Sequence, residues 1–430
     1  MHKKVWQLAA PIILANMTVP LLGAVDIAVV GHLPGPQFMA AVGIGATIFS
    51  ALYFGFVFLR MGTTGLVAIA YGGDNHHEST AWLIRSILIA IILGLLLIIA
   101  KPIISNICFY FIHPEGESLA LAQQYFSIRI FSAPAALCNF ALLGWMIGQH
   151  KTKQALYTQL ILNITNIILD IYFVVNLKLG VPGAAYATVI AEYIGLGYGL
   201  FLSYQAIKLY FSQVAIAELL RIDKLKKLAS INNNIFIRSL CLQMALFYFT
   251  MTGATFGDTV LAVNAVLINF QLFMAYGLDG FANAAEALVG ESIGKRQHKN
   301  FIKTLKVTAL WSVLFAIIFT LVYALFWHPI VLLLTNVNTV ILLAQQYIAW
   351  LILLPLLSVW SFWLDGVFIG ATQTKPMRNS MIVSLIIFVA LCLTLTPTWG
   401  NHGLWCAFSV FMLIRAITLG SALPRLIHKF

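Results

Sequence analysis

The sequence predicts an all-α integral membrane protein with twelve transmembrane helices in two pseudo-symmetric six-helix lobes. Its 430 residues are 61% hydrophobic and only 9% charged, against roughly 25% charged residues in a typical soluble domain. Twelve apolar stretches approach or exceed the roughly 20 residues that a spanning helix needs, and the second half of the chain repeats features of the first. Together these observations favour a polytopic membrane protein built by duplication.

The predicted spans cover 6–32, 38–71, 79–111, 118–147, 154–176, 181–205, 224–253, 258–292, 299–334, 338–370, 376–396 and 400–424. Several are longer than the hydrocarbon layer requires, so we expect tilt, kinks or extension beyond the bilayer. The start at Met1 resembles a signal peptide, but its apolar run continues too far and lacks an evident cleavage site. We therefore interpret it as a retained first helix.

Lysine and arginine in the connections predict the orientation. With the N-terminus in the cytoplasm, nineteen of these residues fall on the cytoplasmic side, whereas only Lys101 and Lys178 fall on the other. Both termini are therefore expected in the cytoplasm. The net charge of +11 then reflects topology and contact with anionic membrane lipids, and no nucleic-acid partner is needed to explain it.

A charged connection after the sixth span divides the chain into a lobe over 1–206, a linker over 207–223 and a lobe over 224–430. A shift of about 221 residues aligns Ala122-Gln123-Gln124-Tyr125 with Ala344-Gln345-Gln346-Tyr347, and Gly73 with Gly294. Six helices per half give both repeats the same orientation, which is typical of transporters whose lobes rock around a central cavity.

Polar residues gather inside the spans of the first half. Asn163, Asn166 and Asp170 share one face of the fifth span. Thr188 and Glu192 lie on the sixth, and Asp26 interrupts the first. A charge at the centre of a membrane helix costs about 2.5–3.5 kcal/mol on insertion scales, so its retention predicts a function.

These oxygen atoms suit a hard cation such as Na⁺, and the same carboxylates, desolvated and close together, are also candidate proton carriers. An inert network of buried hydrogen bonds is the alternative, and Arg129 or Arg60 could neutralise one of the acids. Composition does not choose between H⁺ and Na⁺.

The second half carries its own polar face. Asp279, Asn283 and Glu286 share one side of the eighth span, and Asp365 lies on the tenth. They are candidates for binding a cationic substrate or a second coupling ion. Arg238 and Arg415 are possible counter-ions, so a structural ion pair is the alternative.

Aromatic residues make up 13% of the chain, and a group of them lies on spans seven, eight and ten. Candidates for the lining of a substrate cavity are Tyr248, Phe273, Tyr276 and Trp360. Packing or lipid contact is the alternative for each. Pro11 and Pro20 interrupt the first span and permit a bend.

No other chemistry is evident. The five cysteines lie scattered in apolar segments, and no phosphate-binding loop, zinc-protease motif or nucleophile elbow is present. We therefore expect no enzyme and no cofactor, with an ion gradient as the energy source.

Four segments resemble the DinF branch of the multidrug and toxic compound extrusion (MATE) transporters. They are Val25–Leu33, Leu59–Gly65, Leu278–Phe281 with Glu286–Gly290, and Leu364–Gly370. The resemblance implies a V-shaped pair of lobes, with Asp26, Asn166, Asp170 and Thr188 as the cation-binding cluster and Pro11 as the bend of the first helix. A seventh-span glutamate that serves coupling in another branch has no counterpart here.

The sequence thus predicts a monomeric antiporter of the cell inner membrane that exports cationic or amphipathic compounds in exchange for inward H⁺ or Na⁺. A flippase or exporter of lipid precursors or metabolites within the same superfamily is the alternative. A major-facilitator transporter is disfavoured, because the loop at Tyr71–His77 lacks that family's Asp-Arg/Lys pattern.

Overall fold

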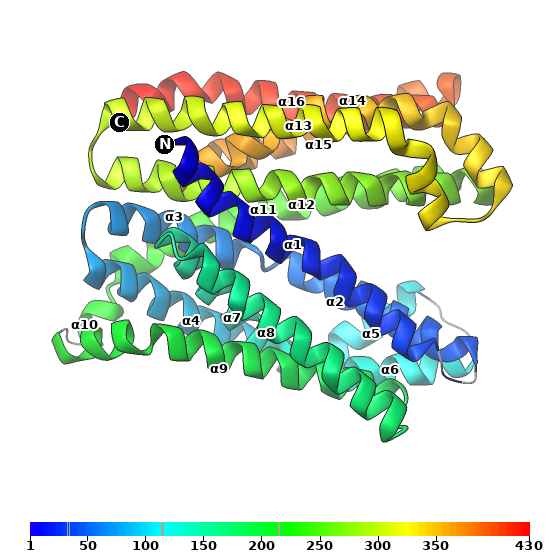
Figure 1. The fold of residues 1–430 in the computed structure, drawn as a ribbon, viewed down its shortest axis with the longest axis horizontal. Helices are drawn as coiled ribbons and strands as arrows, with labels where there is room; N and C mark the ends of the chain where they lie inside the picture. Colours follow the sequence, from blue (N-terminus) through cyan, green and yellow to red (C-terminus); the bar gives the residue numbers. More distant parts are fainter. Residues whose placement is uncertain (32, 34, 113–115, 214–215) are drawn as a thin grey trace. The chain divides into compact units, whose positions relative to one another are not determined.

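We describe the protein from a computed structural model covering residues 1–430, except 32, 34, 113–115 and 214–215 and the side chains of 20–22, 24, 27, 212–213 and 216–217. His32 and the side chain of Pro20 therefore lie outside the description. Every element of the described residues is helical (Figure 1). They are α1 (His2–Val30), α2 (Pro36–Phe54), α3 (Phe58–Gly72), α4 (His76–Ile99), α5 (Lys101–Ile112), α6 (Glu117–Arg129), η1 (Ile130–Ser132), α7 (Ala133–Gly148), α8 (Thr152–Asp170), η2 (Ile171–Asn176), α9 (Val181–Gln213), α10 (Ile216–Leu219), α11 (Ile222–Ala254), α12 (Asp258–Gly294), α13 (His298–Leu334), α14 (Asn338–Gly370), α15 (Thr374–Trp399) and α16 (Asn401–Lys429).

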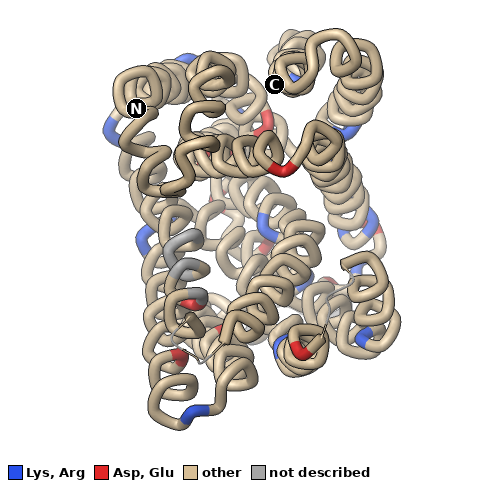
Figure 2. The backbone as a smooth tube through the Cα atoms, turned by 90° about the vertical axis from the view of Figure 1, so that its right-hand side faces the viewer, with Lys and Arg blue, Asp and Glu red and all other residues tan. Residues whose placement is uncertain are grey.

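The predicted membrane helices are present. Eleven helical segments of the described chain are long and apolar enough to cross a membrane, and α1, with 29 residues, corresponds to the remaining predicted span. Figure 2 shows that charged residues are few and widely spaced along the backbone. The chain is thus a multi-pass membrane protein.

Four predicted spans are interrupted, which the apolar pattern did not indicate. The second turns at Gly55 between α2 and α3, the third breaks at Ala100, the fourth passes through η1 and the fifth passes from α8 into η2. Pro102 and Pro134 lie just beyond the breaks in the third and the fourth. Because proline has no N–H to donate to the preceding turn, the α-helical ladder is lost at these points.

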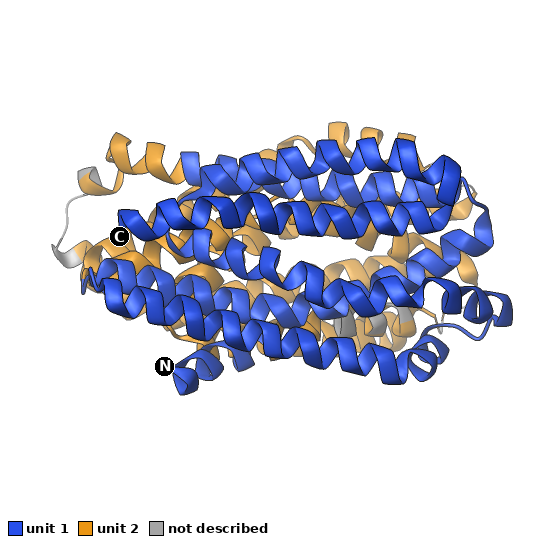
Figure 3. Ribbon diagram, turned by 90° about the horizontal axis from the view of Figure 1, so that it is seen from above, with its two compact units in different colours: residues 1–13, 72–74, 230–430 blue, residues 14–71, 75–229 orange. Residues whose placement is uncertain are grey.

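The chain forms two compact units (Figure 3). Unit 1 comprises residues 1–13, 72–74 and 230–430, and unit 2 comprises 14–71 and 75–229. The helices α1 and α11 therefore each contribute to both units. The first residues of α1 are fixed within unit 1 by an ion pair of 2.6 Å between Lys4 Nζ and Glu291 Oε2, and Trp6 packs edge-on against Phe281.

Four helix–helix loops repeat one backbone conformation. Asp74, His150, Arg296 and Thr372 each adopt a positive φ of 54–63°. In each loop the residue that follows the one with positive φ donates its N–H to the carbonyl five residues before it, as Asn75 does to Ala70. This Schellman arrangement satisfies the last carbonyls of a helix. Asp74 and Arg296 are 222 residues apart, as are His150 and Thr372, so the predicted repeat extends to the backbone.

The same register corrects one detail of the predicted alignment. Gly72 ends α3 and Gly294 ends α12, and each lies two residues before a left-handed residue. Gly72, rather than the Gly73 expected from the sequence, is therefore the counterpart of Gly294.

A close helix crossing in unit 2 depends on two glycines. A Cβ atom on Gly144 would lie 2.4 Å from the carbonyl oxygen of Arg60, and one on Gly148 would lie 2.8 Å from that of Thr64. Glycines four residues apart face the same side of α7, so its backbone can approach α3 directly.

Unit 1 contains the same crossing 222 residues later. A Cβ atom on Gly366 would lie 2.2 Å from the carbonyl oxygen of Ala282, and one on Gly370 would lie 2.3 Å from that of Glu286. The helices α12 and α14 thus repeat the geometry of α3 and α7. This paired contact is the strongest structural sign of the duplication.

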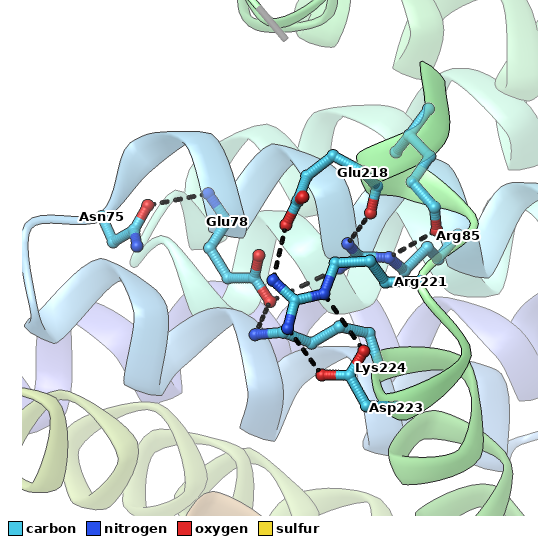
Figure 4. Close-up of polar contacts among 8 residues, drawn as sticks. Asn75, Glu78, Arg85, Glu218, Arg221, Asp223 and Lys224 are labelled. Atoms are coloured by element: carbon cyan, nitrogen blue, oxygen red, sulfur yellow. Dashed lines mark hydrogen bonds and ion pairs between the residues drawn. The ribbon is translucent and has the colours of Figure 1, made fainter. Parts of the chain in front are cut away.

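The connection between the halves is held in unit 2 by a buried arginine (Figure 4). Arg85 of α4 donates from Nε to the carbonyl of Leu219 at 3.0 Å and from Nη2 to that of Glu218 at 2.9 Å. These are the last carbonyls of α10. Glu78 completes the cluster by pairing with Arg85 at 3.4 Å and with Lys224 at 2.8 Å.

Two further contacts reinforce this connection. Arg221 bridges Glu218 at 3.0 Å and Asp223 at 2.9 Å, and the guanidinium of Arg85 stacks over Trp82 at 4.7 Å from the ring centre. Because neutral carbonyls and a carboxylate surround the Arg85 side chain, its burial is compensated. The described end of the predicted linker, 218–223, is therefore held against α4 within unit 2.

The two crossings give the first prediction. Gly144→Ala and Gly366→Ala should each lower stability by about 1–3 kcal/mol, because the added methyl group meets backbone that cannot rotate away. We expect a lower melting temperature in detergent. Gly197→Ala in unit 2 and Gly420→Ala in unit 1 are matched controls, since the first meets nothing within 4 Å and the second only an atom at 3.9 Å. Equal melting temperatures for test and control variants would contradict the close crossing.

Candidate functional site

Two carboxyl groups face each other inside unit 2. Asp26 of α1 and Asp170 of α8 lie within hydrogen-bonding range of each other. Asp26 Oδ1, both Asp170 oxygens and Asn166 Oδ1 are buried and receive no hydrogen bond from a donor group of the described residues. Two ionised carboxylates cannot donate to one another, so this geometry calls for a proton or a cation between them.

Neighbouring amides and hydroxyls extend the cluster. Asn166 donates to Thr188 Oγ1 of α9 at 3.3 Å, and Asn163 donates to Thr18 Oγ1 of α1 at 2.6 Å. The predicted helical face of α8 thus contacts both α1 and α9. The structure brings together all four residues of the predicted ion-coupling set, and it adds Thr18, which the sequence analysis did not single out.

The helix changes its hydrogen bonding directly after the acid. Asp170 is the last residue of α8, and Ile171–Asn176 form a π-helical turn in which Leu177 donates to the carbonyl of Tyr172. Such turns are uncommon and are frequent at functional sites. The extra residue per turn shifts the direction of the side chains that follow.

A cation and two further polar groups border the carboxylates. Arg129 of α6 donates to Tyr125 Oη at 2.7 Å and lies near Asp26 and Glu192. Glu192 Oε2 accepts a hydrogen bond of 2.8 Å from Asn139 of α7. Arg129 is the counter-ion considered in the sequence analysis. Tyr125 was noted there only as part of a repeated motif, and nothing in the sequence pointed to Asn139.

The charged residues of unit 1 form a compact ion-pair network. Asp365 of α14 accepts hydrogen bonds from Arg238 of α11 and, at 2.9 Å, from Arg415 of α16. Arg415 also lies over the rings of Phe362 and Phe411. The ion-pair alternative for Asp365 therefore describes its contacts, and the carboxylate ties three helices together.

The other acidic candidates of unit 1 lie along α12. Asn283 donates to the main-chain carbonyl of Asp279 at 2.7 Å, one turn back in the same helix. Glu286 is buried at the α12–α14 crossing, where helix backbones are in contact. Asp279 and Glu286 are thus on one helix, as predicted, and Asp365 belongs to the separate arginine network.

Within the described residues, the positions of unit 1 that correspond to this polar cluster are largely apolar. At the 222-residue shift, Asn166 and Asp170 correspond to Phe388 and Cys392, which are buried in the apolar core of unit 1. Before the last helix of each half the shift is 220 residues, as between Gly180 and Gly400, so that Thr188 corresponds to Phe408. Thus three of the four cluster positions are apolar in the other half.

The predicted cavity aromatics have different surroundings. Tyr248 packs edge-on against Phe388, whereas Phe273 and Trp360 are 42% and 44% exposed. Tyr276 is partly buried on α12. The role of these four side chains in a cavity stays a prediction.

The first helix runs without interruption through Pro11, and the boundary between the units falls two residues later, at Ile13 and Leu14. A bend at Pro11 stays a prediction. Among the described residues, no group of three or more His, Cys, Asp or Glu side chains could hold a metal ion. The oxygen set around Asp26 and Asp170 instead has the hard donors that H⁺ or Na⁺ prefers.

Comparison with known proteins agrees with this architecture. The family model MatE matches residues 11–172 and again residues 235–394, one segment in each half of the chain. The chain belongs to the MatE family. Members of this family are cofactor-independent, ion-coupled secondary transporters, so the prediction of a transporter rather than an enzyme is confirmed.

Two curated relatives cover almost the whole transporter. DNA damage-inducible protein F of Escherichia coli K12 is 39% identical over 97% of this chain and 91% of its own length. Multidrug resistance protein NorM of Vibrio cholerae is 25% identical over 97% and 94%. The predicted resemblance to the DinF branch is therefore confirmed.

Solved structures share the fold. A MOP superfamily transporter from Pyrococcus furiosus superposes with a TM-score of 0.88 at 20% identity, covering 99% of this chain and 96% of that one. An outward-facing multidrug resistance MATE family transporter gives the same TM-score and identity, over 100% and 97%. The predicted all-helical MATE fold is confirmed.

The arginine network of unit 1 gives the second prediction. Asp365→Asn should lower stability by about 3–5 kcal/mol, because it leaves two buried guanidinium groups without their carboxylate. We expect a lower melting temperature in detergent. Asp258→Asn, at an exposed acid of α12, is the control.

A triple variant that also carries Arg238→Leu and Arg415→Met should recover much of the lost stability, since it removes the uncompensated charges. If Asp365→Asn alone melts like the wild type, the network does not stabilise unit 1.

Proposed function

We propose that this MatE transporter exports cationic or amphipathic small molecules in exchange for inward H⁺ or Na⁺. The observation that carries the proposal is the facing pair of Asp26 and Asp170, whose buried oxygens have no donor among the described residues. A site that needs a proton or cation to be neutral gains and loses that ion reversibly. This is the requirement for coupling to an ion gradient.

The coupling set consists of Asp26, Asn166, Asp170 and Thr188. The oxygen atoms that would bind the ion come from three helices, so ion binding would draw α1, α8 and α9 together. Because α1 contributes residues to both units, a change in its shape at Pro11 would link ion binding to movement of the lobes. Alternating access follows from that link.

The remaining features of the proposal concern the cellular setting. The transporter lies in the cell inner membrane with both termini in the cytoplasm, as the lysine and arginine distribution favours. It works as a monomer of two lobes, 1–206 and 224–430, joined by 207–223, and contacts membrane lipids but no nucleic acid. Asp279, Asn283 and Glu286 are the candidates for substrate or ion contacts in the second lobe, and Asp365 could serve there only by exchanging its arginine partners.

The third prediction tests coupling. Purified protein in proteoliposomes should move a cationic dye against its gradient when a pH gradient or a Na⁺ gradient is imposed, and each gradient is applied separately. Asp26→Asn and Asp170→Asn should reduce dye movement to the rate seen without a gradient, because each removes a carboxylate that holds the ion. Initial rates of dye movement are the measurement.

Asp258→Asn is the control, since it removes an acid outside the polar cluster and should transport like the wild type. Dye movement driven by neither gradient would overturn secondary antiport. Flipping of a labelled lipid without dye and ion exchange would favour the lipid exporter. Wild-type rates in both aspartate variants would remove the coupling role from this pair.

A further inference from the structure

Arg129 is the arginine of unit 2 that borders the facing carboxylates. Its Nη1 donates to Tyr125 Oη at 2.7 Å, and its guanidinium lies 4.8 Å from the ring centre of Phe49 and 5.5 Å from that of Tyr125. Its Nε is buried and has no acceptor among the described residues. The aromatic rings thus hold the charge in place while leaving part of its donor capacity unused.

Charged and titratable groups face Arg129 from several helices. Asp26 of α1, Asp170 of α8 and Glu192 of α9 are close enough for Coulombic attraction. Tyr53 of α2 adds a phenol, whose hydroxyl group lies 2.9 Å from that of Ser132.

The charge balance gives Arg129 a role. Arg129 places a positive charge beside three carboxyl groups, those of Asp26, Asp170 and Glu192. An ion that binds the acid pair is attracted by the carboxyl groups and repelled by this guanidinium. Without Arg129 the ion would be held more tightly and released less readily.

The internal repeat supports the link between this arginine and the acids. Tyr125 and Tyr347 end the same Ala-Gln-Gln-Tyr motif, but four residues later unit 2 has Arg129 and unit 1 has Leu351. Leu351 is fully buried in the apolar core. The arginine is thus present in the half that has the acid pair and absent from the half in which Asp170 is replaced by Cys392.

We propose that Arg129 is a tethered cation that weakens ion binding at the Asp26–Asp170 pair enough to permit release, and so sets the ion affinity of the transporter. It is a positioning residue, because it acts on the carboxylates and need not touch the substrate. This inference rests on the proposed coupling function and assigns the residue that tunes it.

The fourth prediction compares charge-removing and charge-keeping variants. The probe is whichever of H⁺ and Na⁺ drives dye export by the wild type, and the readouts are the half-saturating concentration of that ion and the maximal rate. Arg129→Gln should lower the half-saturating concentration by about tenfold, the scale of one nearby charge, and should also lower the maximal rate. Arg129→Lys should stay close to the wild type.

Binding is measured independently of transport, by titrating the melting temperature of the detergent-solubilised protein with NaCl at constant ionic strength and, separately, with pH. The half-shift is the ion concentration that gives half of the maximal change in melting temperature. It should be lower for Arg129→Gln than for the wild type. Arg221→Gln, on the exposed linker, is the control for loss of a positive charge elsewhere and should leave the half-shift unchanged.

The double variant Arg129→Gln/Glu192→Gln removes one carboxyl group together with the guanidinium and should return the half-saturating concentration toward the wild-type value. The melting temperature without added ion, compared among the variants, separates a folding defect from a change in ion affinity. Unchanged or weaker ion binding in Arg129→Gln, or equal effects of the Gln and Lys variants, would overturn the proposal.

The two proposals fail in different ways. If no gradient drives the wild type, the coupling function and the role of Arg129 both fall. If an ion gradient drives dye export by the wild type and the Arg129 variants bind the ion as the wild type does, only the role of Arg129 is refuted.

Discussion

A charge inside an apolar helix bundle has to be neutralised, because neither lipid nor packed side chains solvate it. The two units meet this constraint differently. In unit 1, Asp365 is held by Arg238 and Arg415, so its charge is compensated by permanent partners. In unit 2, Asp26 and Asp170 face each other near Arg129. Our proposal assigns the rest of their compensation to an exchangeable ion, whereas the fixed partners of Asp365 stabilise unit 1.

The duplication makes this contrast informative. The loops at Asp74 and Arg296 share one backbone conformation, and the glycines of the α3–α7 and α12–α14 crossings make the same backbone contacts. The scaffold has therefore been kept while the side chains inside it have diverged. A polar cluster in one half corresponds largely to an aromatic cluster in the other, so ion chemistry and apolar packing can be divided between equivalent frameworks.

The division into units also shows where the polypeptide passes from one unit to the other. The helices α1 and α11 each contribute residues to both units, and the connection before α11 is folded onto α4 through Arg85. The first helix also carries Asp26, so the carboxylate that we propose for ion coupling lies on a helix that both units share.

The sequence by itself determined the membrane helices, the duplication and the residues of the polar cluster. Apolar length and helical periodicity are local properties, and Asn163, Asn166 and Asp170 had to share a face once their segment was helical. Proline positions near Ala100 and η1 were visible, but whether a helix breaks or bends depends on its neighbours. Only the tertiary structure decided the partners: Asp365 with two arginines, Asp26 with Asp170, and Arg129 with Tyr125. Residues on different helices meet through packing, and the close crossings that bring them together depend on contacts between segments far apart in the chain.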